Sequence, residues 1–211
     1  MAKIDFDNPS RRGGRSGPLT RLLLALAFMT TGGTSAALRP EAGPATVPLA
    51  VGEQEFDEHE VKAAMMVRFL DYVDFPETQL PKDAKSLVIA ILGTDPFGKK
   101  LDKLCIDGKA KGKSLVIRRY KDLAEATDLG AVHVVFLSSS LDKQMPKAIK
   151  ALEGKSVLTI GDTAKFVDAG GMIGLVLADK KVKFEVNNGA AKKAALSISS
   201  KLLKMALRTI G

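Results

Sequence analysis

The sequence predicts an α/β fold: a single three-layer, Rossmann-like domain whose sheet is mainly parallel and carries an antiparallel edge hairpin. From residue 53 onward, segments with helical spacing alternate with short apolar runs of strand length. Two of these runs, residues 87–92 and 132–137, are nearly continuous in apolar side chains, as is typical of strands covered on both faces. Residues 182–186 instead alternate apolar and charged side chains, which indicates an edge strand with one face in water.

The helices are predicted by apolar residues that recur three and four positions apart. The first covers about residues 57–72 and ends before Pro76, because proline cannot continue a helix. Helices over 97–104 and 141–152 fit between the strands, and a long last helix is expected over about residues 189–207. The core-facing stripe of this last helix consists of Ala191, Ala194, Ala195, Ile198, Leu202, Met205 and Ala206.

The strands are predicted from apolar runs too short for helices. These runs are residues 87–92, 115–117, 132–137, 157–160 and 173–177. A turn at 178–181 then joins the last of them to the alternating strand, so that the two form a hairpin.

The N-terminal segment has the three parts of a secretory signal peptide. Four arginines (Arg11, Arg12, Arg15 and Arg21) precede the apolar run 22–29, and small residues follow as far as Ala37. This run of eight residues is too short to span a bilayer, which takes about 20 residues, although an uncleaved anchor is the alternative. We therefore expect a cleaved signal peptide over 1–37, a flexible linker over 38–52, and a periplasmic domain over 53–211.

The composition is that of a globular domain, with 45% hydrophobic and 27% charged residues. Of the net charge of +8, about +5 belongs to the chain after residue 37, which suits an anionic partner or membrane surface but demands neither. Cys105 is the only cysteine, so no disulfide can form within one chain and no cysteine-based metal cluster is expected.

Three loops follow predicted parallel strands, where ligands bind in open α/β sheets. Each is expected to lead to a helix N-terminus, whose free backbone N–H groups favour an anion. The candidate ligand-binding residues are Gly93, Thr94, Asp95, Ser138, Ser139, Asp162 and Thr163. The alternative is that their side chains only cap the helices.

Known catalytic and cofactor motifs are not found. The loop from Gly93 to Gly98 lacks the Gly-Lys-Ser/Thr ending of a P-loop and the three glycines of a dinucleotide-binding fingerprint, and the chain has no G-x-S-x-G elbow. His59 is expected in solvent and His133 within a buried strand, and neither has metal-ligand spacing; a Cys105–His133 dyad has no support from spacing. We therefore expect no catalytic residue, metal or cofactor.

Residues 99–121 are strongly basic, with nine lysines and arginines against two aspartates. They lack the run of interleaved aromatic residues that supports single-stranded nucleic acid, so no nucleic-acid partner is expected. A solvated face is the simplest interpretation, with an anionic membrane surface as the alternative.

Eight segments, in order over residues 60–206, carry a resemblance to a known family. They are Val61–Ala64, Phe69 with Phe75–Pro76, Ile91–Gly93 with Asp95–Gly98, Val135–Ser138, Val157–Ile160, Phe166 with Gly170–Ile173, Phe184–Asn187, and Leu196–Leu203. In these the chain resembles the YfiR-like family of exported regulators. One departure is Phe75, where relatives more often have tryptophan before the proline.

The resemblance implies a periplasmic protein without enzymatic activity. Such a protein represses a membrane-bound diguanylate cyclase by binding its periplasmic sensor domain, which links envelope conditions to cyclic di-GMP and biofilm formation. It also implies a homodimer. Redox control through disulfides, which a relative could use, is not expected within one subunit here, because Cys105 has no partner cysteine.

Binding through a protein interface predicts an exposed apolar patch, for which Met65, Met66, Phe69 and Phe75 around the first helix are the candidates. The alternative is that these residues belong to the core, as expected for Met65 and Phe69. A second hypothesis is a small-molecule-binding module with its pocket at the strand-end loops, feeding another membrane sensor. A third, an enzyme, would need a catalytic constellation that the sequence does not display.

Overall fold

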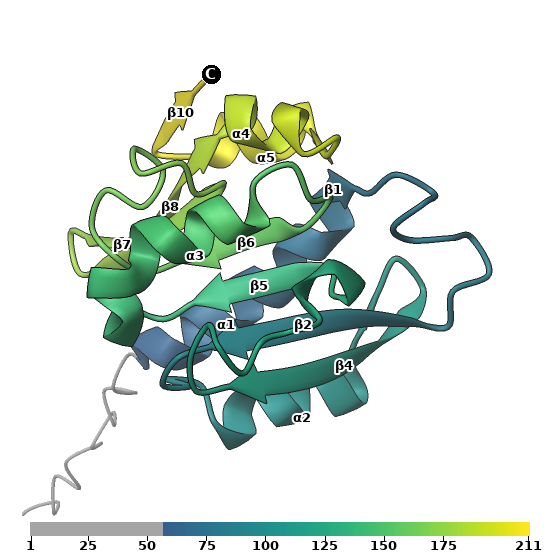
Figure 1. The fold of residues 1–211 in the computed structure, drawn as a ribbon. Helices are drawn as coiled ribbons and strands as arrows, with labels where there is room; N and C mark the ends of the chain where they lie inside the picture. The colour runs from purple at the N-terminus through teal and green to yellow at the C-terminus, as the bar shows by residue number, and fades with distance from the viewer. Residues whose placement is uncertain (1–56) are drawn as a thin grey trace, which may run out of the picture. The chain divides into compact units, whose positions relative to one another are not determined.

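A computed structural model describes residues 57–211, shown as the coloured ribbon in Figure 1. The signal peptide and linker expected over residues 1–52 lie outside the described residues. No helix within residues 57–211 is long and apolar enough to cross a membrane.

The centre of the domain is an eight-stranded mixed sheet with the order β10-β8-β7-β6-β5-β2-β4-β3. Its strands are β2 (Ser86–Leu92), β3 (Lys109–Ala110), β4 (Lys113–Tyr120), β5 (Val134–Leu137), β6 (Leu158–Gly161), β7 (Ile173–Ala178), β8 (Lys181–Asn187) and β10 (Arg208–Ile210). The five strands β4, β2, β5, β6 and β7 run parallel, and β8 returns antiparallel to β7. The predicted mainly parallel sheet with an antiparallel hairpin is thus confirmed.

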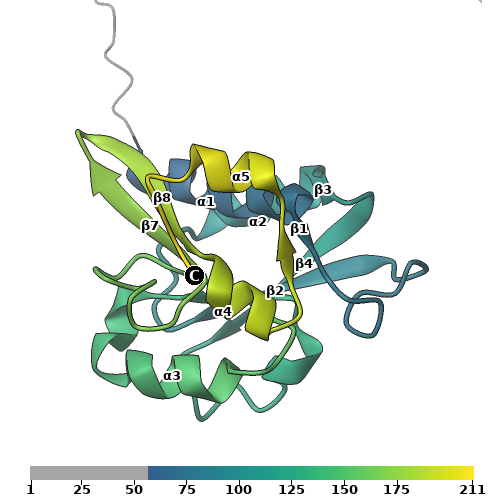
Figure 2. The ribbon, with the colours of Figure 1, turned by 90° about the horizontal axis from the view of Figure 1, so that it is seen from above.

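Helices cover both faces of this sheet, which confirms the three layers. They are α1 (Glu58–Phe69, continued by a 3₁₀ turn at Leu70–Tyr72), α2 (Lys99–Asp107), α3 (Met145–Leu152), α4 (Asn188–Lys193) and α5 (Ser200–Met205). Figure 2 shows α1, α2 and α5 on one side and α3 on the other. Each side has its own cluster of buried apolar side chains.

Strand β2 shows why the sequence folds into these layers. Leu87, Ile89 and Ile91 pack into the cluster beneath α1 and α2, whereas Val88 and Leu92 pack into the cluster beneath α3. Every residue from Leu87 to Leu92 is buried because successive side chains of a strand point to opposite faces. The continuous apolar run is therefore the direct signature of this central strand.

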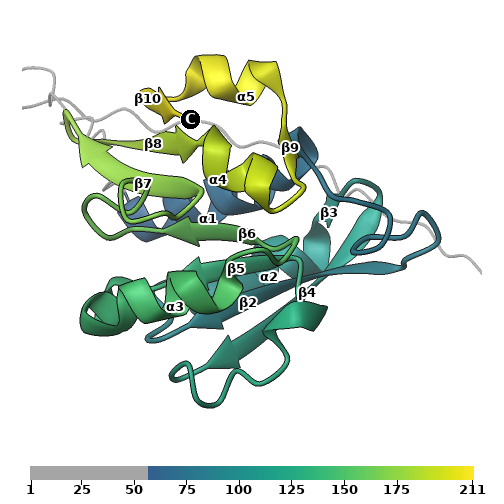
Figure 3. The ribbon, with the colours of Figure 1, turned by 45° about the horizontal axis from the view of Figure 1, so that its top comes forward.

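The predicted long helix over residues 189–207 is wrong. The chain forms α4, then β9 (Ser197–Ile198), α5 and β10, and β9 pairs with β1 (Val73–Asp74) in a separate two-stranded sheet (Figure 3). Helix α4 ends because Ala195 adopts φ +57°, in the left-handed region, and the Leu196 N–H donates to the Ala191 carbonyl at 2.9 Å. The Ser199 side chain then caps α5 by accepting from the Leu202 N–H at 3.3 Å.

The hairpin of β7 and β8 is antiparallel as predicted, and β8 lies at the edge of the sheet over residues 181–184, whereas β10 covers its last three residues. Strand β10 pairs in parallel with its outer side, placing Arg208 beside Glu185. The Arg208 guanidinium contacts both Glu185, at 2.9 Å, and Asp168, at 2.8 Å. The alternating pattern of β8 therefore reflects one buried face, with Phe184 and Val186, and one partly exposed face, on which Lys183 and Glu185 form ion pairs.

Candidate functional site

The three predicted strand-end loops lie side by side at the carboxyl ends of the strands, because β2, β5 and β6 are adjacent parallel strands. The backbone N–H of Thr94 donates to Ser140 Oγ at 2.9 Å, which joins the loop after β2 to the loop after β5. The N–H of Ser139 donates to Asp162 Oδ1 at 3.1 Å, which joins the loop after β5 to the loop after β6.

A buried lysine, which the sequence analysis did not single out, completes this cluster. Lys62 of α1 is only 6% exposed, and its Nζ lies 3.3 Å from Asp162 Oδ2 and 2.7 Å from Glu58 Oε1. Its position four residues before Met66 and seven before Phe69, on the buried stripe of α1, is the signal that could have found it.

The loops are closed against one another. A Cβ atom on Gly93 would lie 2.6 Å from Ser140 Oγ, which leaves no room between these two loops. Ser138 Oγ accepts from the Ser140 N–H at 3.3 Å and so caps the turn that follows β5. Among residues 57–211, one buried side-chain polar atom of the cluster, Thr163 Oγ1, lacks a hydrogen-bond partner.

Asp95 has a capping role and an ionic role together. It accepts from the Phe97 N–H at 2.8 Å and from Arg119 Nε at 2.7 Å. Burial alone would raise the pKa of Asp95, but the Arg119 side chain and the backbone hydrogen bonds outweigh it, so the pKa lies below its ordinary value. Asp95 is therefore an anion that the fold itself neutralises.

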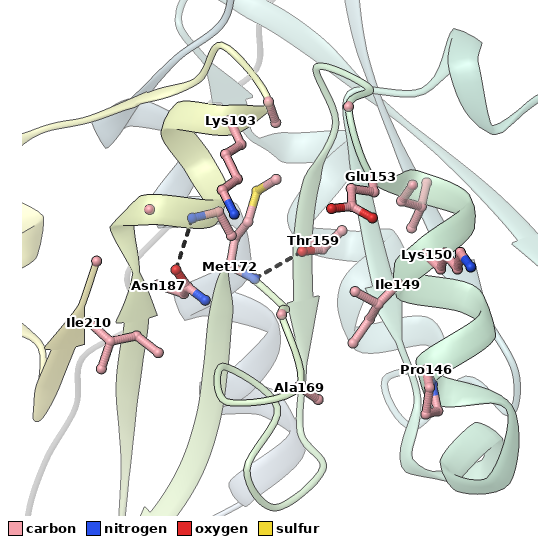
Figure 4. Close-up of a pocket in the computed structure, with 17 residues that line it drawn as sticks. Pro146, Ile149, Lys150, Glu153, Thr159, Ala169, Met172, Asn187, Lys193 and Ile210 are labelled. Atoms are coloured by element: carbon pink, nitrogen blue, oxygen red, sulfur yellow. Dashed lines mark hydrogen bonds between the residues drawn. The ribbon is translucent and has the colours of Figure 1, made fainter.

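A cavity of about 600 Å³ lies elsewhere, between α3 and α4 at the opposite end of the sheet, where β6 and β7 begin (Figure 4). Its floor carries Thr159, whose Oγ1 accepts from the Met172 N–H at 3.0 Å. Its lining residues are Pro146, Ile149, Lys150, Leu152, Glu153, Gly154, Thr159, Ala169, Gly170, Met172, Asn187, Gly189, Ala190, Lys193, Ala194, Ile210 and Gly211.

The cavity combines an apolar interior with charges at its rim. Ile149 and Met172 are among the apolar lining residues, and the exposed Lys150, Glu153 and Lys193 belong to α3, the turn after it, and α4. None of these three charged residues forms an ion pair within residues 57–211. Such a cavity can take a small molecule with an apolar body and a charged end.

Comparison with family models decides what kind of protein carries this domain. A model described as YfiR/HmsC-like matches residues 59–207, which is nearly all of the described chain. The chain belongs to the YfiR/HmsC-like family.

Two solved structures are similar to this YfiR/HmsC-like domain at low sequence identity. A conserved domain protein from Vibrio cholerae is 15% identical, with a TM-score of 0.48 over 73% of this chain and 60% of that one. The ABC domain in complex with L-Trp from Streptococcus pneumonia is 12% identical, with a TM-score of 0.49 over 68% and 60% of the two chains. The chain thus spans about 60% of the length of each structure. Comparison with curated proteins gives no significant match.

The YfiR/HmsC-like domain does not present the first helix as an apolar surface. Met66 is 0% and Phe69 3% exposed, and the Phe69 ring packs against Phe184 with 4.9 Å between centroids. These two candidates are core residues because the apolar stripe of α1 faces the sheet. Met65 and Phe75 are half-buried and pack against the same cluster. Large apolar side chains are exposed instead at Ile106, Val116, Leu177, Met205 and Leu207.

His133 and Cys105 both lie in the interior. The His133 Nδ1 accepts from the Val88 N–H at 3.0 Å, and burial lowers the pKa of this imidazole. Burial, followed by the Asp102 charge, raises the pKa of Cys105 to about 11. Within residues 57–211 no group of three or more acidic, histidine or cysteine side chains could hold a metal ion.

Proposed function

We propose that this protein is a non-enzymatic periplasmic regulator that binds the periplasmic sensor domain of an inner-membrane diguanylate cyclase and represses it, thereby controlling cyclic di-GMP and biofilm formation. The YfiR/HmsC-like family is one of periplasmic regulators, and its model matches residues 59–207. That match is the observation that carries the proposal.

The geometry of the strand-end loops supports regulation by binding over catalysis. In open α/β sheets, substrates and cofactors are held at the carboxyl ends of the strands. Here Asp162 already accepts from Ser139 and contacts Lys62, while Thr163 Oγ1 has no hydrogen-bond partner within residues 57–211. A substrate would first have to break these contacts, which favours recognition through the outer surface.

A direct binding measurement tests the proposal. We expect the exported domain to bind the isolated periplasmic domain of a diguanylate cyclase encoded beside it in isothermal titration. Met65→Glu should weaken this binding at least about tenfold if the half-buried Met65 borders the interface. Ala64→Glu, at the neighbouring exposed position, is the matched control. Absence of binding by the wild-type domain would refute the proposed partner.

Self-association as a homodimer is a further part of the proposal, and the family resemblance is its only support. Sedimentation velocity of the exported chain should then give the mass of two copies at micromolar concentration. A monomer at all concentrations up to the millimolar range would remove the dimer from the proposal.

A second candidate function is small-molecule binding, which the cavity between α3 and α4 favours. Ligand binding to the native state raises the melting temperature, so a screen of amino acids, nucleotides and peptidoglycan fragments should find a stabilising compound. Ala190→Phe fills the cavity wall and should abolish that shift, whereas Ala151→Phe, exposed on α3 outside the lining, should keep it. No shift at millimolar ligand would count against a ligand-binding role.

A further inference from the structure

The outer edge of β4 is open along most of its length. Strand β3 pairs with β4 only through Lys109 opposite Ser114 and Ala110 opposite Lys113. Figure 3 shows β3 beside the beginning of β4 and β4 continuing as the outermost strand. In the part of the chain that the structure describes, residues 115–120 pair on one side only, with β2.

The register decides which backbone groups are free at this edge. The Ser114 N–H donates to the Lys85 carbonyl and the Tyr120 carbonyl accepts from the Gly93 N–H, so even-numbered residues of β4 turn their backbone groups towards β2. Leu115, Ile117 and Arg119 therefore turn theirs outward. Such a row of three N–H and three C=O groups is a template for another strand.

Unpaired lysine side chains stand at both ends of the free edge, with Asp107 near one end and with Asp122 and Glu125, which accepts from the Lys121 N–H at 2.9 Å, near the other. The exposed Lys109 and Lys121 stand at its two ends, and neither forms an ion pair within residues 57–211. Exposed Lys103 on α2, which packs on β4, adds a third unpaired cation beside it. Arg118 and Arg119 are already neutralised, the first by Asp128 and the second by Asp95 and Asp102.

Apolar surface beside the edge would be covered by an added strand. Val116 is 42% exposed in the middle of β4, an unusual exposure for a valine within a sheet. A strand laid along the outer edge would place its own side chains beside Val116 on one face and beside the half-buried Ile117 on the other.

We propose that the outer edge of β4, from Leu115 to Tyr120, binds an extended acidic segment of a partner protein by β-strand addition. The main-chain groups of Leu115, Ile117 and Arg119 supply the hydrogen bonds, and Lys109 and Lys121 select acidic side chains. This inference goes beyond the proposed function, because it does not depend on which protein supplies the segment. It also assigns a use to the basic stretch 99–121.

The charges disfavour a second copy of this chain at the same edge. Two copies of β4 paired antiparallel about Ile117 would bring the exposed Lys121 of each copy against the start of β4 in the other copy, where β3 already pairs with Lys113 and carries the exposed Lys109. Like charges directly opposite each other destabilise a sheet. An acidic strand in the same place would bring opposite charges together, which stabilises the pairing.

Amide hydrogen exchange of the exported chain, resolved by NMR, tests this proposal. The probe is a ten-residue peptide in which glutamate alternates with valine and threonine, and the control peptide has lysine in place of each glutamate. We expect the acidic peptide to slow exchange at Leu115, Ile117 and Arg119 about tenfold. Exchange at Val116 and Arg118, which already pair with β2, should not change. High salt should weaken the protection.

Charge variants distinguish binding that depends on the lysines beside β4 from nonspecific association of the peptide with a basic protein. Lys109→Glu with Lys121→Glu should abolish the effect of the acidic peptide, whereas Lys155→Glu with Lys192→Glu, at exposed lysines on other elements, should leave it intact. Equal protection by both peptides, or by neither at millimolar concentration, would overturn the proposal. Protection that appears without peptide as the protein concentration rises would assign the edge to a second copy and would also overturn it.

Discussion

The ammonium group of Lys62 lies 3.3 Å from Asp162 Oδ2 and ties the first helix to the loop that follows β6. The two side chains are only 7% and 8% exposed, and Asp162 also accepts from the Ser139 N–H. One buried ion pair therefore holds α1 and two strand-end loops together. Of the candidate ligand-binding residues, Ser139 and Asp162 bond to each other, whereas Thr163 Oγ1 has no hydrogen-bond partner within residues 57–211.

Removing the lysine charge should destabilise the domain strongly. Lys62→Met keeps the length of the side chain but leaves the buried Asp162 carboxylate uncompensated, which costs about 3 kcal/mol of unfolding free energy. Denaturant titration followed by circular dichroism measures the loss. Lys82→Met is the matched control, because the ion pair of Lys82 with Glu77 is 89% and 71% exposed and should contribute less than about 1 kcal/mol. Equal losses in both variants would show that the buried pair has no special role.

Two glycines that hold the Phe166 ring should not tolerate a methyl group. A Cβ atom on Gly171 would lie 2.1 Å from Phe166 Cε1, and one on Gly161 would lie 2.5 Å from Phe166 Cε2. Because neither glycine has a positive φ, the effect of Gly171→Ala is steric, and we expect a loss of about 3 kcal/mol. Gly130→Ala, with no atom within 4 Å of its added Cβ, should change stability by less than about 0.5 kcal/mol. A Gly171→Ala protein as stable as wild type would contradict this packing.

Stability should fall as the pH drops below the ordinary pKa of histidine. Burial lowers the folded-state pKa of His133 from its value of 6.5, so between the two pKa values the unfolded chain binds more protons than the native state. Unfolding free energy, measured at closely spaced pH values, should therefore decrease as the pH falls from 7 through 6.5 and level off below the folded pKa.

The variant His133→Asn should flatten this pH dependence, because the asparagine carbonyl can accept from the Val88 N–H without titrating. His59→Asn, at an exposed position in α1, should retain the wild-type profile. If His133→Asn kept the full slope, another group would have to be responsible.

Cys105 should be chemically silent in the native protein. Its thiol is buried and its pKa is raised to about 11, so it is almost entirely protonated at pH 8. Iodoacetamide followed by mass spectrometry should modify Cys105 in denaturant and leave it unmodified in the folded chain over the same time. Rapid labelling of the folded chain would place the thiol at the surface.

Much of the fold could be predicted because its central strands are buried on both faces. The apolar run of residues 87–92 can serve only as a buried element, and it forms β2. The meeting of Thr94 and Asp162 with the loop after β5 follows from parallel topology alone. The predicted family, too, is confirmed by the family model.

The C-terminal segment, the cavity and the buried lysine could not be predicted, because they depend on tertiary contacts that the spacing of apolar residues in the sequence does not reveal. Alanine favours helices, so the stripe from Ala191 to Ala206 resembled one helix, yet Ala195 reverses the chain at φ +57°. Ser197 and Ile198 then pair with β1, far away in the sequence. The cavity escaped prediction for the same reason, because α4 and β10 form one of its walls. Lys62 escaped because a lysine in a helix is normally exposed.

Cellular cyclic di-GMP in a strain deleted for this gene tests the proposed repressor function most directly. Complementation uses the full chain and, as a control, a chain that lacks residues 1–37. We expect cyclic di-GMP to rise on deletion, to return to its original level with the full chain, and to stay high with the truncated chain that is not exported. An unchanged level on deletion would contradict repression of a diguanylate cyclase.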